Sequence, residues 1–158
     1  MARLRSIRRA LRRTAEIDGR SRALLAEAVV SLLLARLALI FISFPKLARR
    51  FGTFVPPDDD RALQAKIRGT EQQVDLAEKI GWAVTRAARN IPFKAVCLPQ
   101  AMAARVMLKR RGLASVVHFG ATRSDGKAFE AHAWLDAAGV EVTGYPVAKE
   151  FLEIACFV

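Results

Sequence analysis

Cys97 and His132 are the residues whose types and surroundings suggest nucleophilic chemistry. Cys97 opens a segment in which Pro99 is typical of a first helical turn, so the thiol is expected at a helix N-terminus. The positive end of the helix macrodipole stabilises a thiolate at that position. An imidazole within reach would act as the general base, and this pair is the minimum unit for acyl transfer through a thioester. The alternative for Cys97 alone is a buried structural cysteine.

His132 lies in the middle of a segment with strand character, residues 128–136. Alternation along a strand places one polar set on one face: Glu130, His132, Trp134 and Asp136. The other face is apolar, with Ala131 and Ala133 as its small residues, and a meander packed against the Cys97 helix would bring the imidazole to the thiol. His118 is the rival base, but its apolar strand favours a packed or hydrogen-bonded histidine. Cys156 is interpreted as a small buried hydrophobic residue.

The elements that must position these residues are helices first and strands last. Hydrophobic periodicity, prolines and glycines predict helices over 22–44, 46–52, 71–89 and 101–111, and strands over 115–121, 128–136 and from 140 onward. This order is typical of an α+β fold. The predicted organisation is an N-terminal basic and apolar helical segment (1–52), a linker (53–70) and a core (71–158).

Composition limits the remaining classes of function. The 158 residues suit one compact domain, and an apolar share of 53% excludes global disorder. Two cysteines cannot form a disulfide framework, and their small number indicates a reducing compartment. The sequence has no spacing typical of metal ligands and no glycine-rich phosphate loop. We therefore expect neither a metal nor a cofactor.

The net charge of +11 is concentrated in the first two thirds of the chain. Residues 1–20 hold seven arginines against two acidic residues. This basic terminus is interpreted as a solvated chain end, or as a contact for an anionic membrane surface. Specific nucleic-acid binding is not expected, because no aromatic-basic stacking motif or recognition helix is evident. The apolar stretch 22–44 is interrupted by Glu27 and Arg36, which favours a buried or interfacial helix over a membrane span.

Four stretches of the sequence form a recognisable combination: Cys97–Ala101, Leu108–Leu113, His118–Gly120 and Phe129–Asp136. Together they resemble the transglutaminase-like cysteine peptidases of lasso peptide biosynthesis, the B proteins in their stand-alone leader-peptidase form. The resemblance covers about residues 71–158, and the helix at 22–50 is also similar to the N-terminal part of that group.

The resemblance implies a papain-like, transglutaminase-type core with a nucleophile helix packed on a small antiparallel meander. It implies a cytoplasmic peptidase that removes the leader from a ribosomal precursor peptide, with Cys97 as nucleophile and His132 as general base. A separate small leader-recognition protein would hold the leader, and an ATP-dependent macrolactam cyclase would act afterwards. Two other functions remain open: transglutaminase-like acyl transfer, and a non-catalytic basic helical module for a membrane surface or nucleic acid.

The sequence departs from the family at the third catalytic position. The family usually carries an aspartate about a dozen residues after the histidine, but the stretch Val142–Pro146 contains no carboxylate. Asp136 is the candidate retained here, although its Cα would lie roughly 13 Å from that of His132 along one strand. Glu141, a backbone carbonyl or a side-chain amide are the alternatives.

Overall fold

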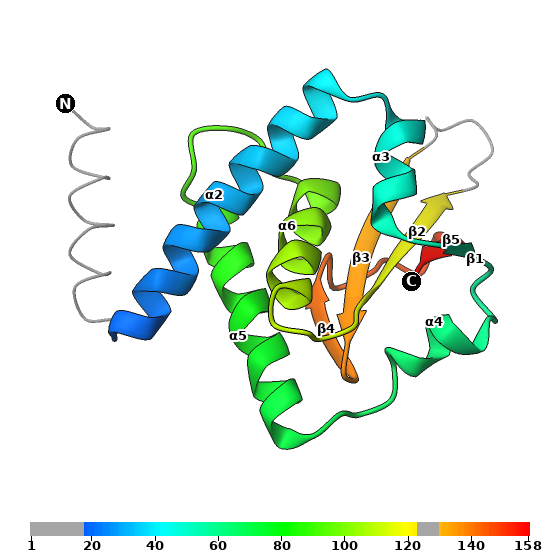
Figure 1. The fold of residues 1–158 in the computed structure, drawn as a ribbon. Coiled ribbons are helices and arrows are strands. Elements are labelled where there is room, and N and C mark those ends of the chain that lie inside the picture. Colours follow the sequence, from blue (N-terminus) through cyan, green and yellow to red (C-terminus); the bar gives the residue numbers. More distant parts are fainter. Residues whose placement is uncertain (1–17, 123–129) are drawn as a thin grey trace.

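A computed structural model describes residues 18–122 and 130–158 of the chain (Figure 1). The helices are α2 (Gly19–Phe41), α3 (Phe44–Phe51), α4 (Asp60–Gln64), α5 (Glu71–Ala88) and α6 (Cys97–Lys109). The strands are β1 (Phe54–Val55), β2 (Val116–Thr122), β3 (Ala131–Ala137), β4 (Val140–Thr143) and β5 (Phe151–Phe157). Helices with a small antiparallel sheet confirm the predicted α+β class. Most of the basic terminus (1–17) and the start of the strand predicted over 128–136 lie outside the described residues.

Local sequence signals explain where the long helices begin and end. Thr70 and Gln73 form a capping box at the start of α5, in which each side chain bonds the backbone N–H of the other. Helix α2 ends before Pro45, which falls instead in the first turn of α3. Helix α6 begins at Cys97 and includes Pro99 in its first turn, as the sequence predicts.

The five strands form one antiparallel sheet in the order β1-β5-β2-β3-β4. Strands β2, β3 and β4 are the predicted meander. Strand β5 was not predicted, and it pairs with the other side of β2, so the chain crosses from one side of the sheet to the other between β4 and β5. This addition makes β2 a central strand, paired on both sides.

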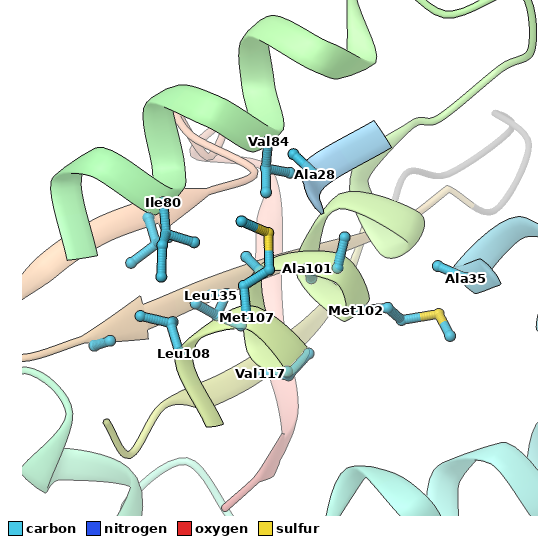
Figure 2. Packing of buried hydrophobic residues seen from close by; sticks show 14 of the residues in the cluster. Ala28, Ala35, Ile80, Val84, Ala101, Met102, Met107, Leu108, Val117 and Leu135 are labelled. Atoms are coloured by element: carbon cyan, nitrogen blue, oxygen red, sulfur yellow. The ribbon is translucent and has the colours of Figure 1, made fainter. Parts of the chain in front are cut away.

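The main core lies between the helices α2, α5 and α6 and one face of the sheet. Figure 2 shows Met107 and Leu108 of α6 beside Val117 and Leu135 of the sheet, and all four are fully buried. Burial of side chains of this size contributes roughly 1.5–3 kcal/mol each. Helix α2 contacts both α5 and α6, so the N-terminal helical segment shares this core.

The segment predicted as a linker, residues 53–70, contains β1 and α4. Strand β1 pairs with β5, and Asp59 caps α4 by accepting a hydrogen bond from the Arg61 backbone N–H. A second, smaller apolar cluster forms here from Val55, Ala62, Ala65, Val116 and Cys156. The segment therefore packs against the rest of the domain, whatever boundary role it has.

Candidate functional site

Cys97 is the first residue of α6, and its side chain is half-buried. No side chain caps this helix, since Val96 occupies the cap position. The Gln100 side-chain amide donates a hydrogen bond to the Ala95 carbonyl (2.7 Å), which fixes the segment leading into the helix. Backbone N–H groups in a first helical turn have no intrahelical acceptor, so they can stabilise an oxyanion formed next to Cys97.

His132 is the second residue of β3, and its ring is held by one hydrogen bond and two aromatic neighbours. Its Nε2 lies 2.6 Å from the Gly144 carbonyl oxygen. Because a carbonyl only accepts, Nε2 carries the proton and the lone pair of the neutral ring is on Nδ1. The ring centroid lies 6.0 Å from that of Trp134 and 5.2 Å from that of Phe151. The imidazole is therefore oriented with its basic nitrogen opposite Gly144.

The structure corrects the expected packing of β3. The apolar residues of β3, including Leu135, face α6, whereas His132 and Trp134 lie on the opposite face of the sheet because side chains alternate along the strand. In Figure 1, α6 and β3 begin on the same side of the view, and Cys97 is the first residue of α6 and His132 the second of β3. Among the described residues, no hydrogen bond joins the two side chains.

Asp136 does not contact His132. Its Oδ2 lies 3.2 Å from Nε2 of His118, and its Oδ1 accepts a hydrogen bond from the Tyr145 hydroxyl at 2.5 Å. Burial, and then the neighbouring Asp136 carboxylate, raise the pKa of Tyr145 well above its usual value, so this phenol remains a donor. Asp136, predicted as the third catalytic residue, thus lies beside His118. The group that orients the His132 ring is the Gly144 carbonyl.

His118 is the centre of a buried polar cluster that the sequence did not reveal. Its Nδ1 contacts both a Glu153 carboxylate oxygen and the Cys156 Sγ, the latter at 3.3 Å. Burial lowers the pKa of His118, but the contacts with Asp136, Cys156 and Glu153 outweigh this effect and raise the pKa to about 11. His118 is therefore a hydrogen-bonded histidine, as predicted, and carries a positive charge in this cluster at neutral pH.

Cys156 is fully buried, as expected, but its sulfur contacts two polar side chains as well as the apolar cluster. Its thiol donates to Glu153 Oε1 at 2.9 Å. Burial is the main cause that raises the pKa of the Cys156 thiol. This thiol is thus protonated and closed to solvent, which separates it from any role as a nucleophile.

A half-buried thiol on the first residue of a helix, with that helix packed on an antiparallel sheet, is an arrangement that the fold of cysteine peptidases and acyltransferases would provide. A family model, described as the transglutaminase-like superfamily, matches residues 38–156. This chain belongs to the transglutaminase-like superfamily, whose members are usually cysteine-based enzymes. Comparison with curated proteins and with solved structures finds no match.

Proposed function

We propose that this protein is a cysteine peptidase that removes the leader peptide from a ribosomal lasso peptide precursor. The observation that carries the proposal is the Cys97 thiol at the uncapped start of α6, in a chain of this superfamily. The His132 ring supports it, since the Gly144 carbonyl leaves Nδ1 as the atom that accepts a proton.

The proposed reaction has two steps with balanced proton transfers. Cys97 Sγ attacks the scissile carbonyl carbon while His132 Nδ1 accepts the thiol proton. Collapse of the tetrahedral intermediate breaks the C–N bond, and His132 returns the proton to the leaving amine. Water then attacks the thioester with His132 as base, which releases the leader acid and the free enzyme.

The reaction requires the His132 ring to approach Cys97 around the end of the sheet. Strand β4 pairs with β3 only from Leu135 onward, so His132 precedes the part of β3 that β4 covers. Catalytic hydrogen bonds are often long or poorly aligned before substrate binds. We infer that approach of the imidazole to the thiol accompanies binding of the precursor.

The decisive experiment is mass spectrometry of a precursor peptide incubated with the protein, with and without a small leader-binding protein. The proposal expects cleavage products that gain one water, and faster cleavage when the leader-binding protein is present. An ATP-dependent cyclase would then use the freed core amine. A product that gains an added amine instead of water would favour the acyltransferase alternative. Intact precursor with folded protein in both tubes would refute the peptidase.

Selective alkylation tests whether the Cys97 thiol is the accessible one before any substrate is known. Iodoacetamide at neutral pH should label Cys97 at least about 10²-fold faster than Cys156, because only Cys97 is partly exposed. Peptide mapping after short labelling measures the ratio. Equal and slow labelling of both cysteines would favour a non-catalytic module.

We further propose that the protein is cytoplasmic and binds an anionic membrane surface through α2. Among the described helices, α2 has the length and apolar composition of a membrane span, properties that core helices and signal sequences share. One side of α2 packs in the core, but the other leaves seven large apolar side chains at least 39% exposed: Val29, Val30, Leu33, Leu34, Leu37, Ile40 and Phe41. Exposed basic residues lie near this face in the sequence, namely Arg36 on α2 and Lys46, Arg49 and Arg50 on the next helix, α3. An apolar face beside basic side chains suits an interfacial helix on anionic lipid.

Vesicle co-sedimentation tests this contact. Vesicles with anionic headgroups should bind the protein more strongly than neutral vesicles, and Leu34→Glu should weaken that binding. Gln72→Glu at an exposed position of α5 is the matched control, since it also adds one negative charge but on another helix. Equal binding of Leu34→Glu and the unchanged protein would refute the lipid contact, as would a dimer formed through this face in solution.

A further inference from the structure

The buried cluster of His118, Glu153 and Cys156 has no role in the proposed peptidase. His118 on β2 pairs directly with Cys156 on β5, and Glu153 lies three residues earlier on β5. His118 and Cys156 are both 0% exposed. The apolar residues of α4 and β1, Ala62 and Val55 among them, cover Cys156. These three residues thus lie together on β2 and β5, covered by β1 and α4, and Cys156 belongs to a different apolar cluster from α6.

We propose that His118 Nδ1, Glu153 Oε1 and Cys156 Sγ bind a transition-metal ion, with Zn²⁺ as the best match. The three ligand atoms all lie within 4.8 Å of one another. The measured pairs include 3.3 Å between Sγ and Nδ1 and 2.9 Å between Sγ and the carboxylate oxygen. A tetrahedral zinc ion would set such atoms about 3.4–3.6 Å apart, so the ligands would move apart to admit it, most of all His118 Nδ1 and the Glu153 oxygen, which are in the closest contact.

The donor set selects the class of metal. One thiolate, one imidazole and one carboxylate are ligands that zinc accepts together, whereas calcium and magnesium require oxygen ligands. Three protein ligands leave a fourth position for water. Glu153 has a side chain 22% exposed, and its other carboxylate oxygen lies 3.9 Å from Lys66 Nζ. The carboxylate edge of the cluster therefore gives the ion a path from solvent.

The other side of the imidazole has the partners that a metal-bound histidine needs. His118 Nε2 lies 3.2 Å from Asp136 Oδ2 in an ion pair, although its angle falls short of a good hydrogen bond. The Tyr145 hydroxyl donates to the same carboxylate group. A carboxylate on the second ring nitrogen fixes the ring and strengthens a histidine ligand. Asp136 is thus a positioning residue for this site.

Both other ligands converge on the Glu153 carboxylate, since His118 Nδ1 and the Cys156 thiol each contact it. A metal ion among these atoms would take the place of the protons that lie between them. Metal binding at thiolate and imidazole ligands releases protons in this way. The sequence could not indicate this site, because its ligands come from two strands whose pairing is set by the fold.

The test uses the full chain, stripped with a chelator and then mixed with Zn²⁺ alone. We expect about one zinc per chain after desalting, measured by metal analysis, and a higher Tm on zinc addition. Co²⁺ substitution should give the near-ultraviolet charge-transfer band of a thiolate ligand. The band should disappear in Cys156→Ser and persist in Cys97→Ser, which is the matched control because it removes the other thiol.

Two milder variants keep the test valid if Cys156→Ser fails to fold. Glu153→Gln changes a partly exposed ligand and should weaken zinc binding at least about 10-fold. Asp136→Asn leaves all three ligands and should weaken it about 10- to 100-fold. Folded protein without zinc uptake would overturn the proposal, and so would uptake that depends on Cys97 instead of Cys156. The cluster would then be an ion-pair network only.

Discussion

The chain contains two cysteine–histidine pairs, and the pair with the tighter contact is the less suited to catalysis. Cys156 Sγ lies 3.3 Å from His118 Nδ1, with Asp136 on the second ring nitrogen at 3.2 Å. Cys97 and His132 have no hydrogen bond between them among the described residues. Distances alone would assign the activity to the buried pair.

Access to substrate reverses that assignment. Cys156 is fully buried, so no peptide carbonyl can approach its sulfur. Cys97 is partly exposed and begins a helix, where free backbone N–H groups can stabilise an oxyanion. The comparison shows that a nucleophile needs an open approach and an oxyanion hole as well as a base. The buried pair has neither and instead has the features of a metal or ion-pair site.

Cysteine replacement is the strongest test of this difference. Cys97→Ala should lower the rate of precursor cleavage by at least about 10³-fold, since it removes the nucleophile itself. Cys156→Ala is the matched control, and the folded fraction should cleave at close to the original rate. The measurement is the initial rate of product formation by mass spectrometry. A larger loss for Cys156→Ala at equal folded fraction would reverse the assignment of the two pairs.

The sequence predicted the local elements of the fold better than its long-range pairings. Helical periodicity and proline positions located α5 and α6, and alternation assigned the two faces of β3 correctly. Strand β5 was missed, since its place beside β2 depends on pairing between residues far apart in the chain. For the same reason the sequence could not show that the apolar face of β3, and not the face of His132, packs on α6.

The candidate site was predictable only in part, for a related reason. Cys97 and His132 stand out by residue type and local context, but an orienting backbone carbonyl leaves no trace in residue type. Gly144 has φ of +85°, which other residues rarely adopt, and its carbonyl accepts the bond from His132. A search for a carboxylate that orients the histidine therefore overlooks a glycine whose backbone carbonyl does so.

Replacing His118 should destabilise the fold more than replacing His132, although His132 is the proposed catalytic residue. His118→Leu should lower the free energy of unfolding by about 3–5 kcal/mol, because Asp136 and Glu153 lose their buried cationic partner. His132→Leu should cost only about 1 kcal/mol, since it removes one hydrogen bond from a half-buried ring. Urea denaturation of both variants measures the difference. Equal losses would mean that the buried cluster is not an ion-pair network.

Gly144 gives a smaller effect that tests how the His132 ring is held. A Cβ at this position would lie 2.4 Å from the Ala133 carbonyl oxygen, in addition to the strain of a positive φ. Gly144→Ala should therefore lower the free energy of unfolding by about 2–4 kcal/mol. Gly112→Ala is the control, because its φ is +72° but nothing lies within 4 Å of the added Cβ, and its cost should be about 1–2 kcal/mol. Equal costs would show that the backbone near His132 can move aside.

The pH dependence of the free energy of unfolding tests whether His118 of the buried pair is charged in the folded protein. Burial lowers the pKa of His118, but the contacts with Asp136, Cys156 and Glu153 raise it overall to about 11 in the metal-free protein. A folded-state pKa above the unfolded value of about 6.5 means that the stabilisation is fully present below that pH. It is then lost progressively as the pH rises toward 11. The slope from this one group is at most about 1.4 kcal/mol per pH unit.

Chelator-treated protein unfolded in urea between about pH 6.5 and pH 9 should show this decline. In His118→Leu the decline should be flatter by that amount, because the titrating imidazole is gone while the surface charges are the same. Parallel curves for the two proteins would mean that His118 is already neutral when folded, and the charge assigned to the buried pair would then be wrong.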